Sequence, residues 1–176
     1  MIVLVLGGAR SGKSEMAEGM AADLAAGGPV TVLATAVVED EDMAARVAIH
    51  RARRPAGWAT VETGTGLAPA LAEPEGVVLV DALGAWVAAA PELVVDAGGL
   101  CDALVSRVGH TVVVSEEVGL GVHPSSEAGR RFRDALGLLN QQVAAVAHQV
   151  LLVVAGRTLS LDAAPAWPER SSGSPR

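Results

Sequence analysis

Aromatic residues and lysine are scarce in this 176-residue chain. It has no tyrosine, one phenylalanine and three tryptophans, and its single lysine, Lys13, stands against twelve arginines. A single cysteine, Cys101, excludes an internal disulfide, and without a Cys/His cluster no structural zinc site is expected. This cysteine usage fits a reducing compartment, so we expect a cytoplasmic protein.

Long apolar runs are also missing. The opening apolar run meets glycines after six residues, which is too short for a signal peptide, and the Ala-rich stretch 82–91 ends at a proline. The net charge of -7 argues against a protein whose main task is to neutralise a nucleic-acid backbone. We therefore expect no membrane span and no nucleic-acid partner, whereas small anionic ligands still fit.

The length and the apolar content predict one compact domain. Hydrophobic residues make up 51% of the chain and the mean hydropathy is +0.40, which excludes a disordered protein. Residues 163–176 contain three prolines and show no periodicity. We expect a domain over residues 1–162 and a disordered tail over 163–176.

Short apolar runs alternate with segments of helical spacing along the chain. The apolar runs are 2–6, 30–34, 76–80, 111–115 and 150–155, and the helical segments are 14–26, 40–53, 98–108 and 126–148. Continuously apolar runs are typical of strands covered on both faces. The alternation predicts an α/β fold, with a mostly parallel sheet and flanking helices.

A phosphate-binding motif follows the first predicted strand. The residues GGARSGKS match the pattern GxxxxGK(S/T) between a strand and a helix. Glycines let backbone N–H groups point at a phosphate, the lysine bridges terminal phosphates, and the last serine can ligate Mg²⁺. We expect ATP or GTP to be bound here, with Lys13 also catalytic, by Gly7, Gly8, Ala9, Arg10, Ser11, Gly12, Lys13 and Ser14.

A second element of such a site is an acidic residue at the end of another buried strand. Asp81 directly follows the apolar run 76–80 and could hold Mg²⁺ or its water ligands together with Ser14. Alternatively, Asp81 caps the helix that follows it.

Acidic residues open the predicted helix 40–53 and basic residues close it, as the helix dipole favours. At helical spacing, Arg46, Arg53 and Arg54 share a face with His50, and this face could hold a triphosphate. Nearby positive charge favours the neutral imidazole, whose nitrogen can attack phosphorus. The alternative is that His50 is an ordinary surface histidine.

Further motifs give the chain a specific resemblance. They are ATA (34–36), DMAARVAIHRARRPAGW (42–58), VLVDALGAWV (78–87), VSEEVGLGVHP (114–124) and RRFRDALGLLNQQVAAVAHQVLLVVAG (130–156). With GGARSGKS, they resemble the bifunctional adenosylcobinamide kinase and adenosylcobinamide-phosphate guanylyltransferase family of cobalamin assembly. The resemblance extends from residue 1 to about residue 161.

The resemblance implies a RecA-like phosphate-loop fold, a homotrimer and two reactions. The first is phosphorylation of adenosylcobinamide, a corrinoid, and the second is transfer of GMP from GTP through a guanylylated histidine, which His50 matches. It also implies nucleotide contacts at Ala34, Thr35, Ala36, Arg51, Ala52, Arg53, Arg54, Glu62 and Asp81. Mg²⁺ would be the metal cofactor, and ATP and GTP the nucleotide substrates.

One position departs from the family pattern. Glu116 stands where an asparagine is expected, which puts a charge near the presumed site. Glu117 or Glu62 could orient the acceptor hydroxyl, and the sequence does not choose between them. Two other functions stay open at this point: a kinase for one small molecule, or a nucleotide switch that forms no histidine adduct.

Overall fold

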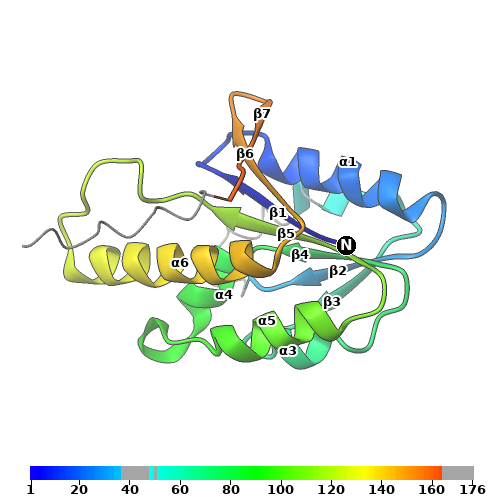
Figure 1. The fold of residues 1–176 in the computed structure, drawn as a ribbon, viewed down its shortest axis with the longest axis horizontal. Coiled ribbons are helices and arrows are strands. Elements are labelled where there is room, and N and C mark those ends of the chain that lie inside the picture. The colour runs from blue at the N-terminus through cyan, green and yellow to red at the C-terminus, as the bar shows by residue number, and fades with distance from the viewer. Residues whose placement is uncertain (37–47, 50, 164–176) are drawn as a thin grey trace, which may run out of the picture.

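The computed structural model describes residues 1–36, 48–49 and 51–163. Within these residues a seven-stranded sheet has the order β3-β2-β4-β5-β1-β6-β7 (Figure 1). The strands are β1 (Ile2–Gly7), β2 (Val30–Ala34), β3 (Ala59–Glu62), β4 (Val77–Asp81), β5 (His110–Glu116), β6 (Gln149–Val154) and β7 (Arg157–Ser160). Neighbouring strands pair in parallel, except that β7 pairs antiparallel with β6. The predicted α/β fold with a mostly parallel sheet is confirmed.

Helices cover both faces of the sheet. The helices are α1 (Lys13–Ala25), α3 (Leu67–Ala70), α4 (Leu83–Ala89), the 3₁₀ helix η1 (Pro91–Leu93), α5 (Ala97–Ser106) and α6 (Glu127–Val146). Helix α1 lies on one face, against β1, β4 and β5, and helices α3 to α6 lie on the other (Figure 1). The central strands β1, β4 and β5 are thereby covered on both faces.

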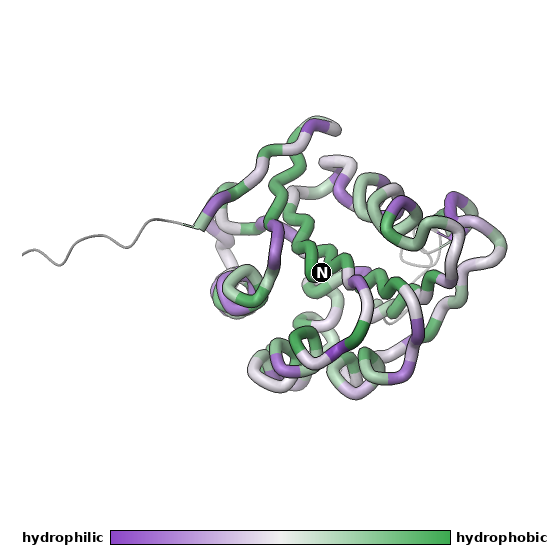
Figure 2. Tube along the Cα trace, turned by 45° about the vertical axis from the view of Figure 1, so that its right-hand side comes forward, coloured by the Kyte–Doolittle hydropathy of each residue, from purple (hydrophilic) through white to green (hydrophobic). Residues whose placement is uncertain are grey.

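Successive side chains of the central strands point to opposite faces of the sheet and pack into two separate hydrophobic cores. In β1, Leu4 packs into the core below α4, α5 and α6, and Val5 packs into the core below α1. Neither side chain is exposed. Figure 2 shows hydrophobic strand segments running through the middle of the molecule. Burial on both faces explains why the strands read as continuous apolar runs.

Two strands, the two short helices α3 and α4, and the 3₁₀ helix η1 were not predicted. Strands β3 and β7 are four residues long and exposed throughout, and they pair at the two edges of the sheet. An edge strand of this kind is stabilised by the ladder to its neighbour, so its sequence carries no apolar run. Helix α4 falls in the Ala-rich stretch, where small residues hide the helical period.

Two predictions fall wholly or partly outside the described residues. Of the predicted helix 40–53, residues 48–49 and 51–53 are described and are helical. The division into a domain of residues 1–162 and a tail of 163–176 stays a prediction. None of the helices in the described part of the chain is long and apolar enough to cross a bilayer.

Candidate functional site

The predicted phosphate loop lies between β1 and α1, in the strand-loop-helix context that the motif requires. Gly12 has a φ of 95° and precedes α1, a conformation that favours glycine. The Ser11 N–H donates to the Gly8 carbonyl at 3.3 Å, which curls the loop. Lys13 Nζ donates to the same carbonyl at 3.3 Å, so the lysine folds back over the loop.

The turn between β6 and β7 supports this loop from the side. The Gly156 N–H donates to the Ser11 carbonyl at 2.8 Å, and the Gly12 Cβ position would lie 3.4 Å from Gly156 Cα. On the other side, the Glu117 N–H donates to the Gly7 carbonyl at 3.1 Å. This supporting turn was not predicted from the sequence, although a glycine, Gly156, lies in it with a φ of 70°.

Parallel pairing brings the carboxyl ends of four strands together along one side of the sheet, which we call the site edge. Gly7, Ala34, Asp81 and Glu116 end β1, β2, β4 and β5, and β5 lies between the phosphate-loop strand and the strand of Asp81. Asp81 is therefore placed at the same edge as the phosphate loop, as its motif predicts. Ligand sites of open α/β sheets form at this edge.

An ion-pair network links Asp81 to helix α1. Arg54 Nη2 lies 2.5 Å from Asp81 Oδ2, and Arg54 Nε lies 3.4 Å from Glu18 Oε1. Arg53 Nε lies 3.3 Å from the other oxygen of Glu18. Arg54 is 7% exposed and Glu18 is 11% exposed, so this pair is largely shielded from water, whereas Arg53 is 38% exposed. Arg53, Arg54 and Asp81, all predicted nucleotide contacts, are thus brought together.

Sequence reasoning did not identify Glu18. It follows Ser14 of the phosphate-binding motif by four residues, and residues four apart share one helix face. That spacing, combined with the paired arginines, is the signal that was available.

The other predicted contacts near this edge form an exposed pair. Arg51 Nη2 lies 2.7 Å from Glu62 Oε1 at the end of β3, with side chains 51% and 71% exposed. Ala52, between Arg51 and Arg53 in the sequence, is exposed and helical. These residues are accessible to a ligand, and their predicted contact with nucleotide stays a prediction.

Thr35 has a structural role at this edge. Its Oγ1 donates to the Ala82 carbonyl at 2.6 Å and accepts from the Ala82 N–H at 3.1 Å. The Thr35 N–H donates to the Asp81 carbonyl at 3.2 Å, and the residue has no exposed surface. Thr35 thereby fixes the backbone that carries Asp81. Nucleotide contact by Ala34 and Ala36 through backbone and shape stays a prediction.

Glu116, the departure from the family pattern, faces the phosphate loop. Its Oε1 lies 3.8 Å from Lys13 Nζ, and its Oε2 accepts from the Gly84 N–H at 3.0 Å. Burial raises the pKa of the Glu116 carboxyl above its ordinary value of 4.5, and the negative charge of Asp81 adds to the rise. The positive charge of Lys13 and the backbone hydrogen bonds oppose this shift of the pKa.

The oxygen donors at this edge suit magnesium. Ser14 is the second residue of α1 and Asp81 ends β4, and hydroxyl and carboxylate oxygens are ligands that Mg²⁺ prefers. The described residues contain no group of three or more His, Cys, Asp or Glu side chains that could hold a metal ion by themselves. The donor set therefore fits a magnesium ion that arrives with a triphosphate, whose oxygens complete its coordination.

Two predicted site residues need separate mention. Arg10 is exposed and has a φ of 57°, so its side chain is accessible at the mouth of the loop. His50, the predicted nucleophile, lies outside the described residues, as does Arg46. Its neighbours Ile49 and Arg51 are helical and exposed.

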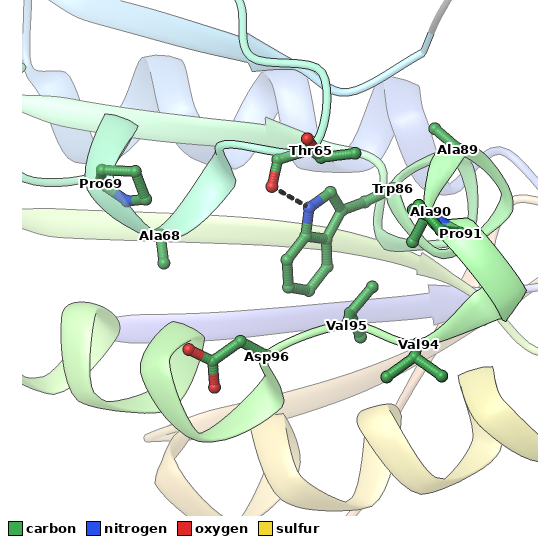
Figure 3. A pocket seen from close by; sticks show the side chains of 10 residues that line it. All are labelled: Thr65, Ala68, Pro69, Trp86, Ala89, Ala90, Pro91, Val94, Val95 and Asp96. Carbon is green, nitrogen blue, oxygen red and sulfur yellow. Dashed lines mark hydrogen bonds between the residues drawn. The ribbon is translucent and has the colours of Figure 1, made fainter.

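A separate apolar hollow lies on the other side of the sheet from α1, between α3, α4 and the start of α5 (Figure 3). Its volume is about 380 Å³, and Trp86 forms part of its wall. The Trp86 Nε1–H donates to the Thr65 carbonyl at 3.0 Å. None of the predicted nucleotide contacts lines this hollow.

Comparisons with known proteins place the chain in a family. Residues 3–161 match the family model described as cobinamide kinase / cobinamide phosphate guanyltransferase. The bifunctional adenosylcobalamin biosynthesis protein CobP of Pseudomonas aeruginosa is 40% identical, over 92% of this chain and 98% of the relative. The corresponding protein CobU of Escherichia coli K12 is 36% identical, over 89% and 97%. This chain therefore belongs to the cobinamide kinase / cobinamide phosphate guanyltransferase family.

Proposed function

We propose that this protein is a bifunctional transferase of cobalamin biosynthesis. It phosphorylates adenosylcobinamide with ATP or GTP, and it then transfers GMP from GTP to that product, giving adenosylcobinamide-GDP. The observation that carries the proposal is a phosphate loop at the same end of the sheet as Asp81 and Glu116, in a chain that matches this family over residues 3–161. The relatives' names describe bifunctional proteins, which supports this function over a single kinase or a nucleotide switch.

In the phosphoryl step, the loop holds the triphosphate while a hydroxyl of the corrinoid attacks the γ-phosphorus in line. The backbone N–H groups of the loop and Lys13 neutralise the charge that develops on the phosphate oxygens. The bond between the γ-phosphorus and the bridging oxygen breaks, and the nucleoside diphosphate leaves.

In the guanylyl step, a neutral imidazole nitrogen of His50 attacks the α-phosphorus of GTP, and pyrophosphate leaves. A phosphate oxygen of adenosylcobinamide phosphate then attacks the same phosphorus. The phosphorus–nitrogen bond breaks, which regenerates the histidine. The arginines around His50 in the sequence, Arg51, Arg53 and Arg54, supply positive charge for the departing pyrophosphate.

Magnesium bound through the nucleotide would neutralise phosphate charge, with Ser14 and Asp81 as its protein ligands. The pairing of Arg54 with Asp81 holds that carboxylate in a fixed orientation at the strand end.

The test is a coupled assay on the purified full chain. Adenosylcobinamide with ATP and Mg²⁺ should give adenosylcobinamide phosphate, and later addition of GTP should give adenosylcobinamide-GDP, both identified by mass. Formation of the first product without the second would show that the protein is a kinase alone. Nucleotide hydrolysis with neither product would indicate a nucleotide switch.

We also propose that the enzyme acts in the cytoplasm as a homotrimer. The location follows from its substrates, because ATP and GTP are cytoplasmic metabolites, and the oligomer follows from the family resemblance. Light scattering coupled to size-exclusion chromatography tests the trimer, and a monomeric mass at micromolar concentration would reject it.

A further inference from the structure

The four carboxylates at the site edge differ in the groups that they contact. Asp81 is paired with Arg54, and Glu62 is paired with Arg51. Glu117 Oε1 accepts from the Gly119 N–H at 2.6 Å, within its own loop. Glu116 points instead at the lysine of the phosphate loop, with Oε1 3.8 Å from Lys13 Nζ.

Glu116 is held in place by residues of two helices, and we call the space that its side chain occupies the seat of Glu116. Its Oε2 accepts from the Gly84 N–H at the start of α4, and a Cβ on residue 84 would overlap that carboxylate. Its backbone carbonyl accepts from Asn140 Nδ2 at 3.1 Å, and Asn140 Oδ1 in turn accepts from the Ser115 hydroxyl at 2.6 Å. The glycine and the asparagine therefore fix both the strand end and the carboxylate.

The position of this seat matters for the phosphoryl step. In phosphate-loop proteins the lysine contacts the β- and γ-phosphates, so a group beside Lys13 lies beside the phosphorus that is transferred. The Glu116 side chain is 31% exposed and Lys13 is 11% exposed, so a substrate can reach the carboxylate. A hydroxyl that attacks this phosphorus would lie within reach of a carboxylate placed there.

Resting on the proposed function, we infer that Glu116 is a catalytic residue of the phosphoryl step. Its carboxylate binds the acceptor hydroxyl and takes the proton as the hydroxyl oxygen bonds to the γ-phosphorus. The bond from the γ-phosphorus to the bridging oxygen breaks, and the nucleoside diphosphate leaves with that electron pair. The proton then passes from Glu116 to water. The asparagine that the resemblance leads one to expect could orient a hydroxyl but could not take its proton.

A competing role is that Glu116 only balances the charge of Lys13. The two roles predict different effects when Glu116 is replaced by glutamine, a neutral side chain of the same shape. Without the catalytic role, Glu116→Gln frees Lys13 for phosphate, so nucleotide binds equally well or more tightly and the turnover rate is kept. With the catalytic role, nucleotide binding is kept while turnover falls.

The experiment compares the wild type with Glu116→Gln, Glu116→Asn and the control Glu75→Gln, an exposed carboxylate just before β4 at the opposite edge of the sheet. We expect kcat for adenosylcobinamide phosphorylation to fall about 100-fold in both Glu116 variants, in line with general-base catalysis. The Kd for ATP should stay within about threefold, and guanylylation of supplied adenosylcobinamide phosphate should persist, which also shows that the variants fold.

Three results would overturn the inference. They are an unchanged kcat in Glu116→Gln, an effect on the Kd alone, and a comparable loss of kcat in Glu117→Gln with none in Glu116→Gln. Gly84→Ala supplies a second test, because it keeps the carboxylate and obstructs its seat, and it should also lower kcat. If the wild type forms no adenosylcobinamide phosphate, the proposed function itself fails, and that result is read before any variant is compared.

Discussion

Arg54 and Asp81 form a shielded ion pair at the carboxyl edge of the sheet, with Nη2 2.5 Å from Oδ2 and side chains 7% and 16% exposed. Arg54 also lies against Glu18, so one guanidinium serves two carboxylates on different elements. The pair ties the residues that follow His50 in the chain to both β4 and α1.

Removing Arg54 should destabilise the protein strongly. Arg54→Ala leaves Asp81 and Glu18 largely buried without their shared cation, a loss of about 3 kcal/mol in the free energy of unfolding. Arg51→Ala is the matched control, because its pair with Glu62 is exposed and is worth at most about 1 kcal/mol. Urea denaturation measures both, and equal losses in the two variants would contradict a buried network.

Thr35 should contribute to stability through its hydroxyl. Thr35→Val keeps the shape of the side chain but leaves the buried N–H and carbonyl of Ala82 without this partner, at a cost of about 1–3 kcal/mol. Thr35→Ser restores the hydroxyl and should recover most of the loss. A valine variant as stable as the wild type in urea would show that the contact contributes nothing.

How far the sequence predicted this molecule depends on the kind of signal. Runs such as 2–6 and 111–115 predicted their strands because burial on both faces favours apolar residues, although the second run has the buried polar residues Thr111 and Ser115 at its two ends. The motif placed Lys13 correctly because its glycine spacing fixes a local backbone shape. Asp81 was placed at the site edge because a parallel sheet gathers its strand ends there.

The missed features depend on contacts between distant parts of the chain. Glu18 belongs to the site because Arg53 and Arg54 lie against α1, and its spacing from Ser14 indicates only that the two residues share a helix face. The seat of Glu116 depends on Gly84, which lies 32 residues earlier in the sequence. Strand β7 exists through its pairing with β6, so its four exposed residues carry no pattern of their own.

Nucleotide should protect Lys13 from chemical modification. It is the single lysine of the chain, so an amine-reactive reagent can label Lys13 and the N-terminal amine and no other amine. With Mg²⁺ and ATP bound, phosphate oxygens would surround the ε-amine and labelling of Lys13 should fall at least tenfold, while the N-terminal label serves as the internal control. Peptide mass spectrometry measures both, and equal labelling with and without nucleotide would place the triphosphate elsewhere.

The stability difference between Glu116→Gln and the wild type should depend on pH. Because burial raises the pKa of Glu116 in the folded protein, its carboxyl favours folding only while it is protonated. That contribution is complete below the unfolded value of about 4.5 and is lost as the pH rises through the raised value. Relative to the wild type, the glutamine variant should therefore gain stability as the pH rises above about 4.5, as measured by urea denaturation at each pH. A difference that stays flat or falls with rising pH would contradict the shift.

The central claim is that one chain both phosphorylates and guanylylates, the latter through His50. The most direct measurement is incubation of the purified protein with Mg²⁺ and GTP, followed by denaturation and mass spectrometric mapping of any GMP adduct, beside His50→Ala. We predict a GMP group on His50 that survives alkali, is lost in acid as a phosphorus–nitrogen bond requires, and is absent from the alanine variant. A wild type that binds GTP and carries no adduct would contradict the histidine mechanism.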